Sequence, residues 1–197
     1  INNMKITNRK LIGFIVIAVG LGILLSSIGL NVRQYFSKKN TVREFKEYIE
    51  SGEGFEEEPE GNEAVIGDMM YILRIPSIES ENPVREGTEK SGLSDSLGHE
   101  SQTALAGEEG NCVIAGHRNY NFGKFFNRLD EVEINDLIYL DSPSETYTYV
   151  VKDIKVVKPD DVEILNQVEG KERLTLYTCT PIYIATHRLV IIAERID

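Results

Sequence analysis

Two cysteines, Cys112 and Cys179, and three histidines are the residues of this sequence from which nucleophilic chemistry could be built. A cysteine acts as a catalytic nucleophile only where a base and a group that stabilises an anion lie near its sulfur. Two cysteines are too few for a disulfide framework, and their spacing matches no zinc-binding pattern. These residue types therefore favour one reactive thiol, with a single disulfide in an oxidising compartment as the alternative.

Cys179 stands where a predicted strand ends and a turn begins. Residues 173–179, RLTLYTC, have the composition of a strand, and Pro181 prevents the ladder from continuing. Arg188 opens the next predicted strand. If the two strands form a hairpin, Cys179 and Arg188 lie within one or two strand spacings of each other. A guanidinium there favours the thiolate and can stabilise an oxyanion formed by attack on a carbonyl.

A histidine is the expected base, and each of the three occupies a different setting. His117 ends the predicted strand 111–117 and follows a glycine that leaves its ring room, and strand ends hold a catalytic group rigidly. His187 precedes Arg188 and should point to the opposite face of their strand. His99 is predicted to lie in a loop. Residue types favour His117, although each histidine can equally be a hydrogen-bonded structural residue.

The elements that must position these residues read as strands. Six runs after residue 64 are rich in Val, Ile, Tyr and Thr and are bounded by turn residues. They are residues 69–75, 111–117, 136–141, 146–157, 173–179 and 187–195. No long helical pattern separates them, so a mainly antiparallel sheet closed into a barrel is the economical fold. Short helical turns are predicted at 122–129 and 161–168, and Cys112 is predicted to be a small core residue.

Residues 11–30 contain no charged residue. As a helix rising about 1.5 Å per residue they would span about 30 Å, the thickness of a bilayer's hydrocarbon core. A buried core helix would carry a polar stripe, and a signal peptide would have a shorter apolar region with an A-x-A-like site. We therefore predict an uncleaved membrane anchor that follows a basic tail at residues 1–10. Basic residues flank it on both sides, so the positive-inside count does not fix its orientation.

Charge is unevenly distributed along the chain. The net charge is -11, yet the first 43 residues hold seven basic residues and no acid. A basic end on an acidic body suits attachment to anionic lipid headgroups. It argues against nucleic acid as a partner, because nucleic-acid binding needs a basic face on the folded part.

The segment 31–63 is predicted to join the anchor to a catalytic barrel at 64–197. Within it, residues 41–51 place apolar side chains on one face of a short amphipathic helix, and residues 53–63 form an acidic linker. No cofactor and no metal site are expected. Glu108 and Glu109, adjacent in a turn, are interpreted as solvated carboxylates rather than as calcium ligands.

Three segments together resemble the sortase family of cysteine transpeptidases. TLYTC (175–179), followed nine positions later by Arg188, resembles the sortase signature TLxTC…R. AGHR (115–118) resembles the segment that carries the family's catalytic histidine. The other similar segments are YILRIP (71–76) and VVKPDDVEIL (156–165). The resemblance covers about residues 65–197, with the motifs in the family's order and spacing.

The resemblance implies a closed eight-stranded sortase barrel with His117, Cys179 and Arg188 as the catalytic residues. Such enzymes cut an LPxTG-like sorting signal at the C-terminus of a surface protein, hold the acyl half as a thioester on cysteine, and pass it to an amine. That amine comes from a cell-wall precursor or a pilin lysine. The barrel would then lie outside a Gram-positive cell on a single-pass anchor. Substrate-binding residues are expected at Thr178, Ile182 and Tyr183.

The subclass is expected to be D or E. Only eight residues separate Cys179 and Arg188, which disfavours class B with its added helix. TCTP and THRL resemble the pilin-polymerising class C, but Ile182 to Ala185 replace its usual Tyr-Gly-x-Asn. The sequence also shows neither the second membrane helix nor the Asp-Pro-aromatic lid of class C. A class C enzyme, a simple cysteine peptidase and a membrane-anchored barrel adaptor remain as alternatives.

Overall fold

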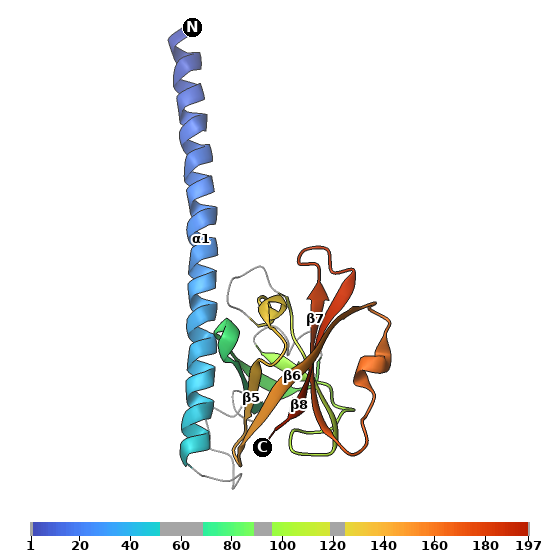
Figure 1. The fold of residues 1–197 in the computed structure, drawn as a ribbon. Coiled ribbons are helices and arrows are strands. Elements are labelled where there is room, and N and C mark those ends of the chain that lie inside the picture. The colour runs from blue at the N-terminus through green and yellow to red at the C-terminus, as the bar shows by residue number, and fades with distance from the viewer. Residues whose placement is uncertain (1, 52–68, 89–95, 119–124, 197) are drawn as a thin grey trace. The chain divides into compact units, whose positions relative to one another are not determined.

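The computed structural model describes residues 2–51, 69–88, 96–118 and 125–196 (Figure 1). The predicted acidic linker at 53–63 lies outside the described residues. The chain divides into two compact units, residues 1–37 and residues 38–197.

One helix, α1 (Asn2–Ser51), covers the predicted tail, anchor and amphipathic segment without a break. Its residues Leu11–Leu30 form a 20-residue span with mean hydropathy 2.7, long and apolar enough by length and composition to cross a membrane. The amphipathic pattern predicted a separate short helix at 41–51. The structure continues the same helix instead, since neither Gly nor Pro occurs between residues 31 and 51 to end it.

The end of α1 belongs to the same compact unit as the strands, because that unit begins at Lys38. Val42 and Phe45 are buried and cluster with Met69 and Ile72. The apolar face predicted for residues 41–51 is therefore the face that this part of the helix buries. Removing these side chains from water stabilises the packing by about 25 cal/mol per Å² of apolar surface.

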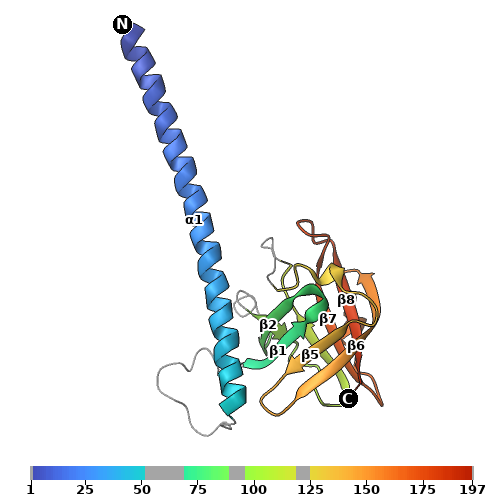
Figure 2. The same cartoon turned by 60° about the vertical axis from the view of Figure 1, so that its left-hand side comes forward.

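Eight strands close into a barrel in the order β1-β2-β3-β4-β7-β8-β6-β5, because β1 also pairs with β5. The strands are β1 (Met69–Ile75), β2 (Ser80–Glu86), β3 (Leu97–His99), β4 (Gly110–Ala115), β5 (Leu137–Asp141), β6 (Thr146–Val157), β7 (Glu172–Thr180) and β8 (His187–Arg195). Among them, β2 with β3 and β4 with β7 run parallel, and the other neighbours run antiparallel. Figure 2 shows β1, β5 and β6 side by side. The predicted closed, mainly antiparallel eight-stranded barrel is confirmed.

The strands β2 and β3 were not among the six predicted runs. The sequence of β2, SENPVRE, lacks a run of β-branched residues and contains Pro83. Pro83 faces Ile72 on β1, and β3 joins β2 only from Val84 onward, so the missing N–H of proline costs no bond to β3. His99 is the last residue of β3 and is buried, so its predicted place in a loop was wrong.

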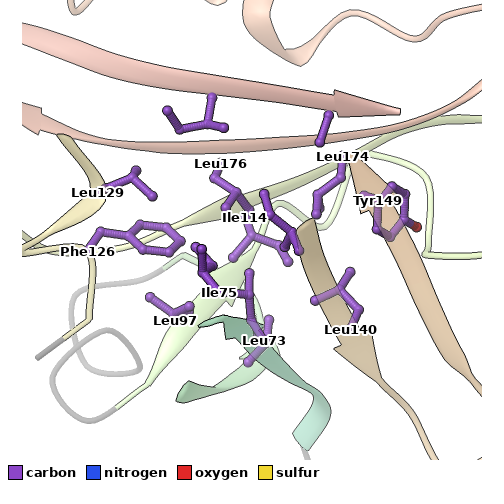
Figure 3. Packing of buried hydrophobic residues seen from close by; sticks show 14 of the residues in the cluster. Leu73, Ile75, Leu97, Ile114, Phe126, Leu129, Leu140, Tyr149, Leu174 and Leu176 are labelled. Carbon is purple, nitrogen blue, oxygen red and sulfur yellow. The ribbon is translucent and has the colours of Figure 1, made fainter. Parts of the chain in front are cut away.

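The barrel interior is filled by aliphatic and aromatic side chains from all eight strands (Figure 3). Leu73 and Ile75 of β1 meet Ile114 of β4 and Leu176 of β7 there. Cys112 belongs to the same cluster, which confirms its interpretation as a core residue. Three short 3-10 turns complete the described fold: η1 (Pro76–Ile78), η3 (Leu129–Glu131) and η4 (Val162–Leu165).

Candidate active site

Cys179 and Arg188 face each other directly across the β7–β8 hairpin. Residues opposite each other in an antiparallel pair project from the same face, with Cβ atoms about 4.5–5.5 Å apart. Both are partly exposed. The hairpin predicted from the turn chemistry thus exists, and it sets a thiol and a guanidinium side by side.

The face that they share is the outer face of the barrel. The neighbouring pair, Thr178 and Leu189, is buried, and Leu189 belongs to the interior cluster. Because side chains alternate along a strand, Cys179 and Arg188 point away from that interior. A partly exposed thiol on this outer face can meet a substrate in solution.

His117 follows β4, which runs parallel to β7. The N–H of Gly116 donates to the carbonyl of Tyr177 (3.1 Å), and Thr178 Oγ1 donates to the carbonyl of Gly116 (2.7 Å). The pairing of β4 with β7 ends at Ala115 and Tyr177; extended by two residues along both segments, its register puts His117 level with Cys179. Two segments separated by more than 60 residues in sequence thus bring an imidazole to the level of the thiol.

Gly116 determines which way His117 points. A Cβ on Gly116 would lie 2.5 Å from side-chain atoms of both Leu97 and Phe126, so this position faces the packed interior. His117, the next residue, therefore projects from the outer face, and it is exposed. We expected the missing side chain of this glycine to leave room for the imidazole. Instead, the side chains of Leu97 and Phe126 in the core occupy that space.

His99 is held as a structural residue. Its Nδ1 lies 2.8 Å from Glu86 Oε2, and its Nε2 lies 3.0 Å from the carbonyl of Ala104. With both ring nitrogens bonded and the residue buried, His99 has no free atom to exchange a proton with a substrate.

His187 lies at the same end of the hairpin as Arg188 but on the other face. It pairs with Thr180, and its Nδ1 lies 3.0 Å from Thr186 Oγ1. This agrees with the alternation expected from the sequence. Of the three histidines, His117 alone combines exposure with the face that carries Cys179.

Tyr177 lies two residues before Cys179 on β7 and projects from the same outer face. It was not among the predicted site residues. Its hydroxyl donates to Glu100, whose other oxygen accepts from Thr88 Oγ1 at 3.1 Å. Burial and then the Glu100 carboxylate raise the pKa of Tyr177, while Arg188 lowers it in part. The phenol therefore stays protonated at neutral pH and keeps its donor role. Period-2 alternation within TLYTC was the signal that could have found this residue.

The three predicted substrate-binding residues occupy different settings. Thr178 is buried, and its hydroxyl donates to the carbonyl of Gly116, so its side chain faces the interior. Ile182 is partly exposed and Tyr183 is 71% exposed, both in the turn between β7 and β8. Their contact with substrate stays a prediction.

The other cysteine is unsuited to nucleophilic attack. Cys112 is buried in the core, and desolvation raises the pKa of its thiol well above the usual range. Both cysteines are free, so the structure has no disulfide between them. Of the two cysteines, Cys179 is therefore the one with an accessible thiol.

The adjacent carboxylates Glu108 and Glu109 bond to backbone. Glu108 accepts from the N–H of Leu105 at 3.1 Å, and Glu109 accepts from the N–H of Gly170 at 2.5 Å. Among the residues that the structure describes, no group of three or more His, Cys, Asp or Glu side chains is arranged to hold a metal ion. In this structure, the two carboxylates hold loop segments through hydrogen bonds from backbone N–H groups.

Residues 73–196 match the family model described as the sortase domain. The chain belongs to the sortase family. Sortase D of Bacillus subtilis (strain 168) is 34% identical over 133 residues, which are 66% of this chain and 65% of that protein. This sortase thus spans somewhat less than two thirds of the length of that relative.

Solved sortases share the barrel. The Clostridium perfringens sortase D5 superposes with a TM-score of 0.66 at 29% identity, covering 81% of this chain and 98% of that one. Sortase C-1 from Streptococcus pneumoniae superposes with a TM-score of 0.64 at 31% identity, covering 72% and 75%. The similarity to class D members is consistent with the D or E subclass expected from the sequence.

Proposed function

We propose that this sortase is a cysteine transpeptidase that cleaves an LPxTG-like sorting signal through a thioester on Cys179. The observation that carries the proposal is the direct pairing of Cys179 with Arg188 across β7 and β8, on the outer face to which the register of β4 brings His117. Thiol, imidazole and guanidinium are the nucleophile, the proton carrier and the anion-stabilising cation that acyl transfer requires.

Each group has one task in the first half of the reaction. The sulfur of Cys179 attacks the threonine carbonyl carbon of the signal, and a C–S bond forms. The C–N bond to glycine breaks as His117 gives its proton to the departing amine. Arg188 stabilises the negative charge that develops on the carbonyl oxygen, which a guanidinium can do through two parallel N–H donors.

The second half reverses these roles. The incoming amine attacks the thioester carbonyl, and neutral His117 takes the proton that the amine loses. The C–S bond breaks, and the thiolate of Cys179 is restored. The two halves together join the surface protein to a new amine, so the reaction requires no oxidant and no cofactor.

The proposed setting is the outer face of a Gram-positive cell membrane. The span Leu11–Leu30 would anchor the chain, with the barrel outside, where sorting signals and wall precursors occur. The acceptor is proposed to be a cell-wall amine, and the similarity to Sortase D supports the single-anchor subclass. The alternative is a pilin lysine, because the chain is also similar to sortase C-1 of Streptococcus pneumoniae.

The test uses the full chain in detergent micelles with a pool of labelled LPxTG-type peptides. Mass spectrometry should find the acyl half on Cys179 in the wild type and no adduct in Cys179→Ala, while Cys112→Ala should still form it. Adding a free amine such as triglycine should move the acyl group to that amine. Release to water alone would instead indicate a peptidase, and peptide binding that survives Cys179→Ala without any adduct would indicate an adaptor.

A further inference from the structure

Arg118 follows His117 directly and points the other way, toward the interior side of the barrel rim. Its side chain is only 8% exposed. One terminal nitrogen donates to Thr180 Oγ1 at 2.8 Å, and the other lies 2.7 Å from Asp130 Oδ2. A single guanidinium therefore joins the residue after the candidate base to the residue after the candidate nucleophile.

The two partners of Arg118 lie on well-held elements. Thr180 is the last residue of β7. Asp130 lies in η3 next to Leu129, which is fully buried in the core beside Phe126 (Figure 3). Asp130 thus lies on a turn whose neighbouring side chain is buried, and its own side chain is 53% exposed.

These contacts matter because the ladder between β4 and β7 stops short of the site. Its last paired residues are Ala115 and Tyr177, two positions before His117 and Cys179. Beyond that point, two side-chain bonds connect the segments: Thr178 to Gly116 before the level of the site, and Arg118 to Thr180 after it. Along the two segments, these two bonds therefore lie on either side of His117 and Cys179.

We propose that Arg118 is a positioning residue that holds the His117 segment against the Cys179 strand through its simultaneous bonds to Asp130 and Thr180. The proposal rests on the transpeptidase function proposed above. A planar guanidinium can bond two acceptors at fixed angles, whereas a lysine ammonium would act as a point charge without that geometry. Misplacing a reacting group by about 1 Å can cost on the order of 100-fold in rate.

The test compares the kinetics of signal cleavage and amine capture by full-length variants in detergent micelles. Arg118→Met should lower kcat about 10- to 100-fold and leave KM within about twofold, because the lost interaction is with the catalytic segment and not with the substrate. Arg118→Lys should recover only part of that loss. The matched control is Arg128→Met, since Arg128 is an arginine beside the same 3-10 turn that bonds Glu131 of that turn and the carbonyl of Ile78.

A second variant keeps the proposal testable if Arg118→Met folds poorly. Thr180→Val removes only the acceptor on β7 and leaves the ion pair with Asp130, so kcat should fall in the same direction with an unchanged melting temperature. In a His117→Ala background, Arg118→Met should change the residual rate of Cys179 acylation by less than about twofold, because its effect passes through His117.

The outcomes separate the two proposals. A wild type that forms no acyl adduct on Cys179 refutes the transpeptidase function and the positioning role with it. A wild type that forms the adduct, with Arg118→Met losing no more kcat than Arg128→Met, refutes the positioning role alone. A rise in KM at constant kcat, or a full additional loss in the His117→Ala background, also overturns it, by assigning Arg118 to substrate binding or to the fold.

Discussion

The two ends of β8 each carry an arginine, and the two arginines are bonded in opposite ways. Arg195, at the far end, donates to Glu172 at 3.0 Å and to Glu145 at 3.1 Å, and it lies over the ring of Tyr147 at 4.7 Å. Arg188, at the Cys179 end, donates to the backbone carbonyl of the preceding residue at 3.1 Å. Among the described residues, no carboxylate forms an ion pair with Arg188.

The charge of Arg195 is neutralised within the fold, whereas the charge of Arg188 remains available to a substrate. The carboxylates around Arg195 neutralise its cation inside the fold, so it can offer little to an incoming anion. Arg188 lies beside a thiol, and none of the carboxylates that the structure describes pairs with it. A cation in that condition favours a thiolate or an oxyanion beside it. If the proposed function is right, the same strand contributes to stability at one end and to chemistry at the other.

The largest expected effect is that of a substitution at Arg188, at the Cys179 end of β8. Arg188→Met should lower kcat/KM by about 100- to 1,000-fold, the range seen when a donor to a developing oxyanion is removed. The melting temperature should stay within a few degrees of the wild type, because no ion pair is lost. Paired measurements of signal cleavage and thermal unfolding on the full chain check both statements.

A stable Arg188→Met variant with nearly normal turnover would contradict this division of roles between Arg188 and Arg195. It would mean that Arg188 is a rim residue like any other and that Cys179 draws its anion stabilisation from elsewhere, such as backbone N–H groups. A variant that loses both activity and stability would also contradict it, because Arg188 would then stabilise the fold as Arg195 does.

At the other end, the expected effect falls on stability. Arg195→Met leaves the Glu172 carboxylate, whose side chain is 16% exposed, with only two neutral donors, Tyr149 and Gly107. We expect a loss of about 1–3 kcal/mol in the free energy of unfolding, less than for a fully buried pair because some solvent reaches both groups. Turnover measured well below the melting temperature should stay within about twofold.

The control for this loss is an exposed ion pair at the same end. Lys171 and Glu194 pair at 2.8 Å with side chains that are 56% and 30% exposed. Lys171→Met should cost less than about 1 kcal/mol, as surface pairs usually do. Equal losses for Lys171→Met and Arg195→Met in urea unfolding followed by circular dichroism would contradict the structural role given to Arg195.

Local patterns in the sequence were sufficient for the hairpin that carries Cys179 and Arg188. The bounds of β1, β6 and β8 were predicted to the residue, because their alternating β-branched and aromatic residues are a local signal. The strand β2 was missed because its composition is that of a loop, and only pairing with β1 and β3 makes it a strand.

The histidines show the limit of local patterns more sharply. His99 is fixed by Glu86 on the neighbouring strand, a contact that depends on the parallel pairing of β2 with β3. His117 comes abreast of Cys179 through the pairing of β4 with β7, and Arg118 reaches Thr180 across the same gap. Both pairings join segments that are distant in sequence, so composition and alternation could not specify them. The place of His117 at a strand end and the family resemblance both favoured it as the base, whereas nothing in the sequence indicated the bonds of Arg118.

The smallest expected effect concerns His187, which adjoins Arg188 and tests whether the face of a residue or mere proximity decides its role. His187 lies on the face opposite Cys179, and what it gives to Arg188 is its backbone carbonyl. His187→Ala keeps that carbonyl, so kcat/KM should stay within about twofold of the wild type, a change of less than about 0.5 kcal/mol. The pH profile of kcat/KM should also keep its shape. A lost limb in that profile would assign the proton-transfer role to His187 instead of His117, and the division between the two faces of β8 would fail.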